Sequence, residues 1–186
     1  MRKAESLSQD RHKLAQFERV VTPHLGAGYN LARWLTRNDQ DAEDVVQDAC
    51  LRAFRGIDGF NGGDSRAWLL AIVRNAAYTW LHRNRNYEAT IPFDDIQQDL
   101  ASASPSPEAV VLSRMDREAI ASALDELPVE YREVLVLREL EDLSYKEIAH
   151  IAGLPIGTVM SRLARARRRL QLSLAAAAAK ELQRGV

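Results

Sequence analysis

The sequence predicts an all-α protein made of two small helical domains joined by a flexible linker. Apolar residues recur at helical spacing in both halves of the chain, whereas almost no segment alternates like a strand. Between the halves, residues 86–111 break this periodicity and carry small or rigid residues typical of a linker: Ser102, Ser104, Pro105, Ser106 and Pro107. The 186 residues, 46% of them hydrophobic, suffice for two packed cores. We therefore expect a first domain over residues 1–85, the linker over 86–111, a second domain over 112–172 and a helical tail over 173–186.

In the first domain, a helix is expected over about residues 41–55. Its buried stripe is predicted to consist of Ala42, Val45, Val46, Ala49 and Ala53. The opposite face is acidic and exposes a leucine, which suits a basic protein partner better than DNA; its members are Asp41, Asp44, Asp48, Leu51 and Arg55. Acidic residues also favour the positive start of a helix dipole, which explains Asp41 and Asp44 but neither Asp48 nor Leu51. Spacing alone leaves both interpretations open.

The next helix, expected over about residues 66–85, carries a face that suits unstacked bases. Its buried residues are predicted to be Leu69, Ile72, Val73, Ala76 and Trp80, and the other face shows Ala71, Asn75, Tyr78, His82 and Arg85. Aromatic rings stack on bases, amides bond their edges, and Arg74, Arg83 and Arg85 would hold the backbone. The glycine-containing loop before it, residues 56–65, either closes over a splayed base or is a plain turn. Trp68 and Trp80 are expected in the core.

Residues 144–170 are the most informative stretch, because they predict a helix-turn-helix within a winged-helix-like domain of four helices. Ser144 and Glu147 form a capping box at the start of a first helix. Gly153 can take the left-handed conformation that ends a helix, Leu154 offers an apolar contact, and Pro155 suits the start of the next helix. The predicted inward stripes are Tyr145, Ile148, Ala149 and Ala152 in the first helix, and Val159, Leu163, Ala166 and Leu170 in the second.

The exposed face of this second helix is rich in hydroxyls and guanidinium groups. Its members are Thr158, Ser161, Arg162, Arg165 and Arg169. Arginine reads guanine in bidentate fashion in the major groove, and hydroxyls contact bases or phosphates. A charge run is usually a solvated helix face, but such faces normally alternate in sign, whereas residues 148–179 contain no acidic residue. The pattern therefore favours a nucleic-acid interface.

The charge of the chain is balanced overall but separated locally. The chain has 25 basic and 26 acidic residues, so any nucleic-acid surface must come from segregated charge. Residues 116–147 are acidic and the segment after them is basic. We expect one face of the second domain to meet protein and the other to meet DNA.

The sequence lacks the residues that several classes of functional site require. Cys50 is the only cysteine, which excludes an internal disulfide and leaves a structural zinc site without ligands. The four histidines lack partner spacing, and no catalytic triad, nucleotide-binding loop or paired-carboxylate pattern occurs. We expect no catalytic residue, metal or cofactor. The first residues lack the apolar core of a signal peptide, and no run approaches a membrane span, so we expect a cytoplasmic protein.

Three segments in order resemble one known family. They are DAEDVVQDACLRAFRGIDGF from residue 41, RAWLLAIVRNAAYTWLHRNR from residue 66, and LDELPVEYREVLVLRELEDLSYKEIAHIAGLPIGTVMSRLARAR from residue 124. Together they are very similar to bacterial extracytoplasmic-function (ECF) sigma factors, group IV of the sigma-70 family. The helix-turn-helix alone would match many repressors, but three motifs with the linker in place are specific.

The resemblance implies a role for each domain. The first would dock its acidic helix on the clamp helices of RNA polymerase through Asp44, Gln47, Asp48 and Leu51. Its next helix would capture the melted minus-ten strand, with Asn75 and Tyr78 at the bases and Arg74, His82 and Arg85 beside them. The second domain would read the minus-thirty-five duplex through Thr158, Ser161, Arg162, Arg165 and Arg169. An anti-sigma protein is a further implied partner. Many relatives carry a basic residue where this chain has Met160, which puts its promoter preference in doubt.

Two other functions fit parts of the sequence. A sigma-like mimic that occupies an anti-sigma factor would not need Asn75, Tyr78 and Arg165 together. A dimeric helix-turn-helix repressor would leave the first domain unexplained. Binding to duplex promoter DNA without polymerase would favour the repressor, and binding to an anti-sigma partner alone would favour the mimic.

Overall fold

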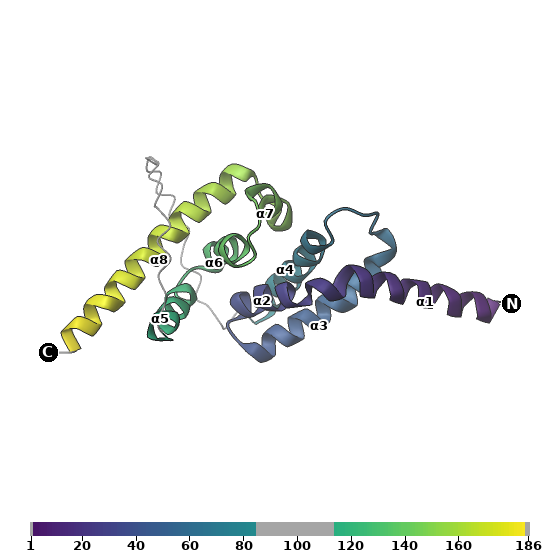
Figure 1. Ribbon diagram of the computed structural model, residues 1–186, viewed down its shortest axis with the longest axis horizontal. Coiled ribbons are helices and arrows are strands. Elements are labelled where there is room, and N and C mark those ends of the chain that lie inside the picture. The colour runs from purple at the N-terminus through teal and green to yellow at the C-terminus, as the bar shows by residue number, and fades with distance from the viewer. Residues whose placement is uncertain (1, 85–113, 185–186) are drawn as a thin grey trace.

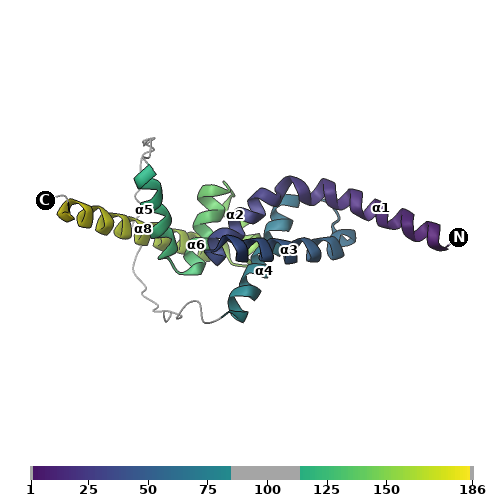
Figure 2. The same cartoon turned by 90° about the horizontal axis from the view of Figure 1, so that it is seen from below.

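The computed structural model describes residues 2–84 and 114–184, and all regular elements in these two ranges are helices (Figure 1). The N-terminal unit, residues 2–84, contains α1 (Arg2–Val21), η1 (Thr22–His24), α2 (Leu25–Thr36), α3 (Asp39–Gly56), η2 (Ile57–Gly59) and α4 (Ser65–Arg83). The C-terminal unit, residues 114–184, contains α5 (Arg114–Asp125), α6 (Val129–Leu135), η4 (Val136–Leu140), α7 (Tyr145–Ala152) and α8 (Ile156–Arg184). The chain ends lie at opposite ends of the molecule, on α1 and α8 (Figures 1 and 2). The prediction of an all-α chain is confirmed for the described residues.

The two long helices expected in the N-terminal unit begin at side-chain caps. The Asn38 side chain accepts a hydrogen bond from the Asp41 backbone N–H at 3.1 Å, and α3 follows. The Asp64 side chain likewise accepts from the Ala67 N–H at 3.0 Å at the start of α4. Each cap satisfies one of the backbone donors that a helix leaves unpaired in its first turn. The helices therefore start slightly before the predicted residues 41 and 66, and Arg85 lies outside the described residues.

Helix α4 is buried on more sides than its single predicted apolar stripe indicates. Leu69, Val73 and Ala76 are buried as expected, but Leu70 and Ala77, on another side of the helix, are buried too. The reason is that α4 packs on α2 and α3 and also on α7 of the other unit. Ile72 and Trp80, predicted to be buried, are half-buried at the edge of this packing, as is Val46 of α3. One amphipathic stripe cannot describe a helix with neighbours on several sides.

In the C-terminal unit, a buried arginine closes the end of α5. Arg132 of α6 is fully buried, and its Nη1 donates to the backbone oxygens of Leu124, Asp125 and Leu127 at 3.4, 3.0 and 3.3 Å. Carbonyl groups at the end of a helix have no partner within the helix, so a guanidinium group is a suitable donor for them. The π-helical turn η4 then leads into the helix-turn-helix.

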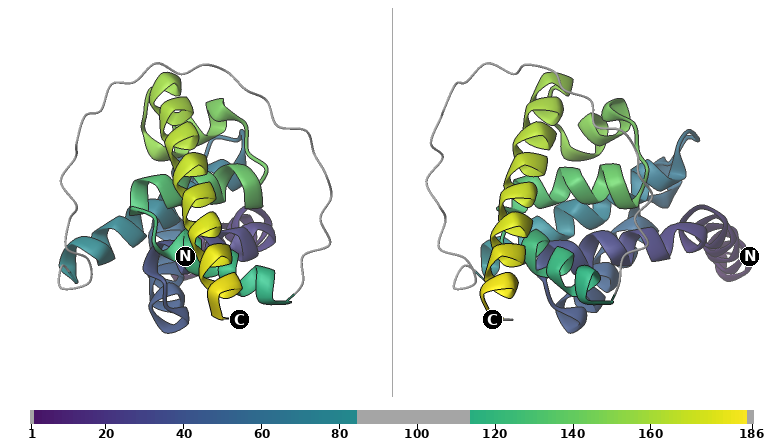
Figure 3. Two further views of the ribbon diagram at one scale, coloured as in Figure 1. Left: turned by 90° about the vertical axis from the view of Figure 1, so that its left-hand side faces the viewer. Right: turned by 60° about the vertical axis from the view of Figure 1, so that its left-hand side comes forward.

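The predicted helix-turn-helix is present in full. The Ser144 N–H donates to Glu147 Oε2 at 2.7 Å and the Glu147 N–H donates to Ser144 Oγ at 3.3 Å, which is a complete capping box at the start of α7. Gly153 ends α7 with a φ of 66°, in the left-handed region that glycine enters most easily. Helix α8 then runs from Ile156 to Arg184, and Figure 3 shows it crossing α5 and α6.

Candidate functional site

The acidic face predicted on α3 is exposed in the structure. Asp44 and Gln47 are exposed, and Leu51 has 53% of its surface accessible. Asp48 is half-buried and forms an ion pair with Arg52, 2.6 Å away, one turn along the same helix. The opposite side of α3 packs on α2 and α4. These four residues therefore form a rigidly supported surface, the α3 face, with carboxylates beside one apolar group.

The predicted base-binding residues lie together on α4 but differ in accessibility. Asn75 and His82 are exposed, whereas Arg74 and Tyr78 are half-buried. The Arg74 guanidinium lies 4.3 Å from the centre of the Tyr78 ring, as a cation–π pair, and donates to Asn75 Oδ1 at 3.3 Å. The sequence identified these side chains as neighbours but gave no sign that two of them are covered.

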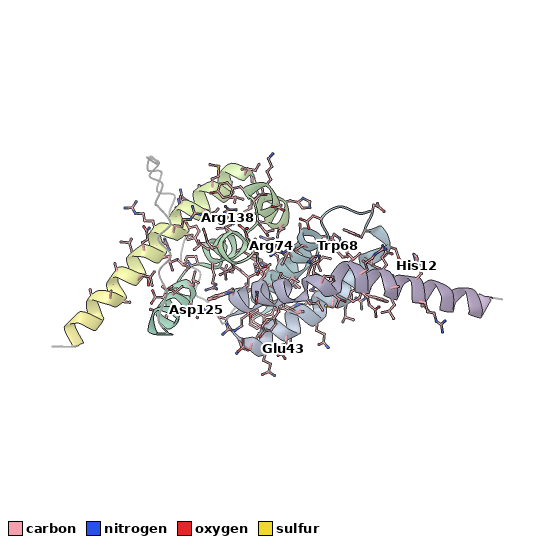
Figure 4. The ribbon with its side chains drawn as sticks, viewed as in Figure 1. His12, Glu43, Trp68, Arg74, Asp125 and Arg138 are labelled. Carbon is pink, nitrogen blue, oxygen red and sulfur yellow. The ribbon has the colours of Figure 1, made fainter. Side chains whose placement is uncertain are left out.

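The cover is supplied by Glu133 of α6, in the other unit. Arg74 Nε donates to Glu133 Oε1 at 2.6 Å, and the Tyr78 hydroxyl donates to Glu133 Oε2 at 2.8 Å. Figure 4 shows Arg74 where α4 faces the C-terminal unit. Burial raises the pKa of Tyr78, and the negative charge of Glu133 raises it further. Burial acts to lower the pKa of Arg74, but the hydrogen bond and charge of Glu133 outweigh it and the pKa is raised.

The predicted DNA-reading residues lie on one face of α8. Arg169 is exposed, and Thr158, Ser161, Arg162 and Arg165 are half-buried. Positions at spacings of three, four and seven share a helix face. The opposite face buries Val159, Leu163 and Ala166, as predicted, whereas Leu170, also predicted there, is half-buried. Two local contacts were not foreseen: the Ser161 hydroxyl donates to the Thr158 backbone oxygen at 3.0 Å, and the Arg169 guanidinium lies 5.2 Å from the centre of the Tyr131 ring.

The residues between the two units that the sequence analysis missed are acidic. Besides Glu133, the C-terminal unit places Glu141 and Asp125 against the N-terminal unit. The available signal was the acidic segment 116–147, for which we expected a protein partner. The structure shows that part of this segment contacts the chain's own N-terminal unit.

Two classes of site find no support in the described parts of the chain. Within residues 2–84 and 114–184, no group of three or more histidine, cysteine or acidic side chains is placed to hold a metal ion. None of the described helices combines the length and apolar character needed to cross a membrane. Cys50 is a half-buried free thiol whose pKa is raised by burial.

Known proteins match both units. Sigma-70 region 2 matches residues 20–87, and sigma-70 region 4 matches residues 117–170. The ECF RNA polymerase sigma-E factor of Escherichia coli is 35% identical over 134 residues, which cover 68% of this chain and 70% of that protein. The chain belongs to the ECF group of the sigma-70 family. The ECF sigma factor SigE of Mycolicibacterium smegmatis is 31% identical over 166 residues, spanning 89% of this chain but only 64% of the relative.

Two solved structures share the fold. The sigma factor RpoE of Bartonella quintana, in complex with the anti-sigma factor NepR, superposes with a TM-score of 0.65 at 30% identity. That match covers 86% of this sigma factor and 96% of RpoE. CnrH, in complex with the cytosolic domain of CnrY, gives a TM-score of 0.62 at 28% identity and covers 86% and 88% of the two chains.

Proposed function

We propose that this ECF sigma factor is a transcription initiation factor that binds core RNA polymerase and directs it to specific promoters. The observation that carries the proposal is the presence of three different candidate surfaces on one chain, in the order that the family has them. Region 2 bears the α3 face and the base-binding residues of α4, and region 4 bears the arginine face of α8. One chain can thus join a protein partner to two separate DNA elements.

The α3 face is the proposed polymerase contact. Asp44, Gln47, Asp48 and Leu51 offer carboxylates around an apolar group, which complements a basic surface with an apolar pocket. The packing of α3 on α2 and α4 holds this face in one conformation, so little ordering is needed on binding. The proposed target is the clamp-helix region of the largest polymerase subunit.

The α4 residues are the proposed minus-ten contact. Asn75 and Tyr78 would bond and stack with bases of the melted strand, while Arg74, His82 and Arg85 hold its backbone. Extruding a base from duplex DNA costs a few kcal/mol, and a pocket that binds the extruded base can offset that cost. Melting is then coupled to capture, and none of these steps requires catalysis by the sigma factor itself.

The arginine face of α8 is the proposed minus-thirty-five contact. A helix-turn-helix places its second helix in the major groove, with the residues near its start at the base edges. Thr158, Ser161, Arg162 and Arg165 occupy the first turns of α8 and Arg169 follows them. Met160 is also exposed there, at 53%, and supplies an apolar group that can meet a thymine methyl.

An anti-sigma protein is a proposed further partner. The Bartonella relative with the same fold is bound to one in its solved structure. The exposed leucine of the α3 face and the exposed Met160 of α8 are apolar groups that such a protein would cover. Binding there would block the polymerase contact and the DNA contact directly.

A titration with core RNA polymerase tests the proposal. The label belongs at the amino terminus, because the half-buried Cys50 thiol, with its raised pKa, will react slowly. We expect tight, saturable binding in fluorescence anisotropy. Absence of binding by the folded protein would reject the proposal and leave the mimic or the repressor.

The variant Asp48→Arg tests the docking face in the same titration. It reverses a charge on the α3 face and places a second arginine beside Arg52, so we expect clearly weaker polymerase binding. Glu18→Arg, an equal charge change at an exposed position of α1, is the control and should bind like the unmodified protein. Equal affinity of the Asp48 variant and the control would rule out this helix as the docking site.

A further inference from the structure

The contact between the two units is electrostatically one-sided. Among the described residues, the following three ion pairs join them, and in each the carboxylate belongs to the C-terminal unit and the guanidinium to the N-terminal unit. Glu133 pairs with Arg74 at 2.6 Å, Glu141 pairs with Arg66, and Asp125 pairs with Arg37 at 3.6 Å. Asn30 also donates to Glu141, at 3.4 Å. The acidic segment of the C-terminal unit is therefore complementary to a basic surface of the N-terminal unit.

Glu133 is at the centre of this contact. Its side chain is fully buried, and each carboxylate oxygen accepts one hydrogen bond, from Arg74 and from Tyr78. A carboxylate with no access to water requires such partners, because an unpaired buried charge costs several kcal/mol. The two groups that satisfy it are residues that the minus-ten proposal assigns to DNA.

Arginine and tyrosine are suited to nucleic acid for the same reasons that they suit Glu133. The guanidinium group binds an anionic oxygen, and the phenol hydroxyl donates to it. While Glu133 holds both, Arg74 retains only 19% of its side-chain exposure, the Tyr78 hydroxyl is bonded to Glu133, and the Arg74 guanidinium lies over the Tyr78 ring. A DNA strand and Glu133 cannot occupy Arg74 and Tyr78 at the same time.

We propose that Glu133, Arg74 and Tyr78 form an autoinhibitory latch, which withholds Arg74 and Tyr78 from the minus-ten strand until the two units separate. This inference rests on the proposed function, because it concerns the DNA-binding residues of α4. The latch leaves the α3 face and the arginine face of α8 accessible, since Asp44, Gln47 and Arg169 are exposed in the closed form. Polymerase can therefore dock first, and the opening of the latch then permits strand capture.

The chemistry of the latch makes it reversible. A buried ion pair gains little relative to its hydrated, separated partners, because the attraction is offset by the loss of hydration. Contacts between domains of one chain generally resemble transient protein interfaces. A ligand that binds the open form more tightly than the closed form, such as a DNA strand at Arg74 and Tyr78, can thus shift the equilibrium toward the open form.

The full-length variant Glu133→Gln tests the latch, because it removes the charge and keeps the shape. Glu139→Gln is the matched control: Glu139 is exposed on η4 and pairs with Arg167 of its own unit at 2.7 Å. Small-angle X-ray scattering measures opening, and anisotropy of a labelled single-stranded DNA pool of randomised sequence measures release of the surface. If the open form is about 1–10% populated, the closed form weakens apparent DNA affinity about 10- to 100-fold. We expect Glu133→Gln to increase the radius of gyration and recover most of that factor, and Glu139→Gln to do neither.

The remaining outcomes contradict the latch. Opening without tighter DNA binding would show that Glu133 joins the units but does not restrain the DNA surface. Unchanged scattering and unchanged DNA binding would show that Glu133 holds nothing closed. If Glu133→Gln fails to fold by circular dichroism, Glu141→Gln opens the same interface at Arg66 and is judged by the same two measurements. Polymerase binding by the unmodified protein is measured separately, so failure of the proposed function and failure of the latch give different results.

Discussion

Removal of the serine cap at the start of α7 should destabilise the C-terminal unit by a defined amount. In Ser144→Ala the Glu147 N–H loses its side-chain acceptor, while the Glu147 carboxylate can still accept from the backbone N–H of residue 144. Loss of a serine cap costs about 0.5–2 kcal/mol. Ser144 is exposed, so water can replace the lost partner, and we expect about 1 kcal/mol. For a chain of this length, that corresponds to a decrease in Tm of about 2–4 °C.

Thermal and urea denaturation followed by circular dichroism measure this effect. Ser122→Ala is the control, because Ser122 is exposed inside α5, where alanine is the better helix former and no cap is lost. We expect the control to be as stable as the unmodified protein or slightly more stable. Equal stability of Ser144→Ala and Ser122→Ala would refute the inference that the side-chain cap supports α7.

The same capping box predicts a pH dependence. Hydrogen bonds from Ser144 lower the pKa of Glu147 below its ordinary value of 4.5. A carboxyl group with a depressed pKa in the folded state contributes stability above its unfolded pKa and loses it as pH falls through the folded one. The stability difference between the unmodified protein and Glu147→Gln should therefore be constant above about pH 5 and diminish below pH 4.5. A difference that grows at acid pH would contradict the sign of this effect.

Other substitutions test the remaining parts of the molecule. Arg165→Ala should reduce promoter-dependent transcription, by a loss of about 1–3 kcal/mol in promoter binding free energy if Arg165 makes a bidentate base contact. Arg168, exposed on the same helix, is the control, and Arg168→Ala should act weakly and equally on all promoters. Identical promoter profiles for the two variants would remove Arg165 from the interface. Leu163→Ala, in the buried stripe of α8, should cost about 2–5 kcal/mol in urea denaturation, and a cost below 1 kcal/mol would indicate that this stripe is not packed. Tyr78 has a raised pKa in the closed form, so its hydrogen bond to Glu133 should be fully stable below pH 10.0 and weaken above it. Subtracting the ultraviolet absorbance of Tyr78→Phe from that of the unmodified protein isolates the Tyr78 signal. While the chain is closed, that signal should show no titration at pH 10.0.

The local features of the fold could be predicted because they depend on neighbouring residues. The Ser144 and Glu147 capping box, the left-handed Gly153 and the buried stripe of α8 each involve residues within a few positions of one another. Backbone sterics and capping chemistry determine them almost without tertiary context. The starts of α3 and α4 were missed by one or two residues because Asn38 and Asp64 were not recognised as caps.

The contact between the units could not be predicted because it depends on residues far apart in the chain. Glu133 lies 55 and 59 positions from Tyr78 and Arg74, and no periodicity links them. An acidic residue on a helix is ordinarily exposed, so its burial can be read only from a structure. The same contact adds α7 to the helices that pack on α4, in which Leu70 and Ala77 are also buried.

Promoter-directed transcription with purified components tests the assignment as a transcription initiation factor most directly. Core RNA polymerase would be combined with this sigma factor on fragmented genomic DNA from its own source, and the transcript start sites would be sequenced. We predict a limited set of start sites, each preceded by the same minus-ten and minus-thirty-five elements and each absent without the sigma factor. Tight binding to core polymerase with no such start sites would contradict the assignment.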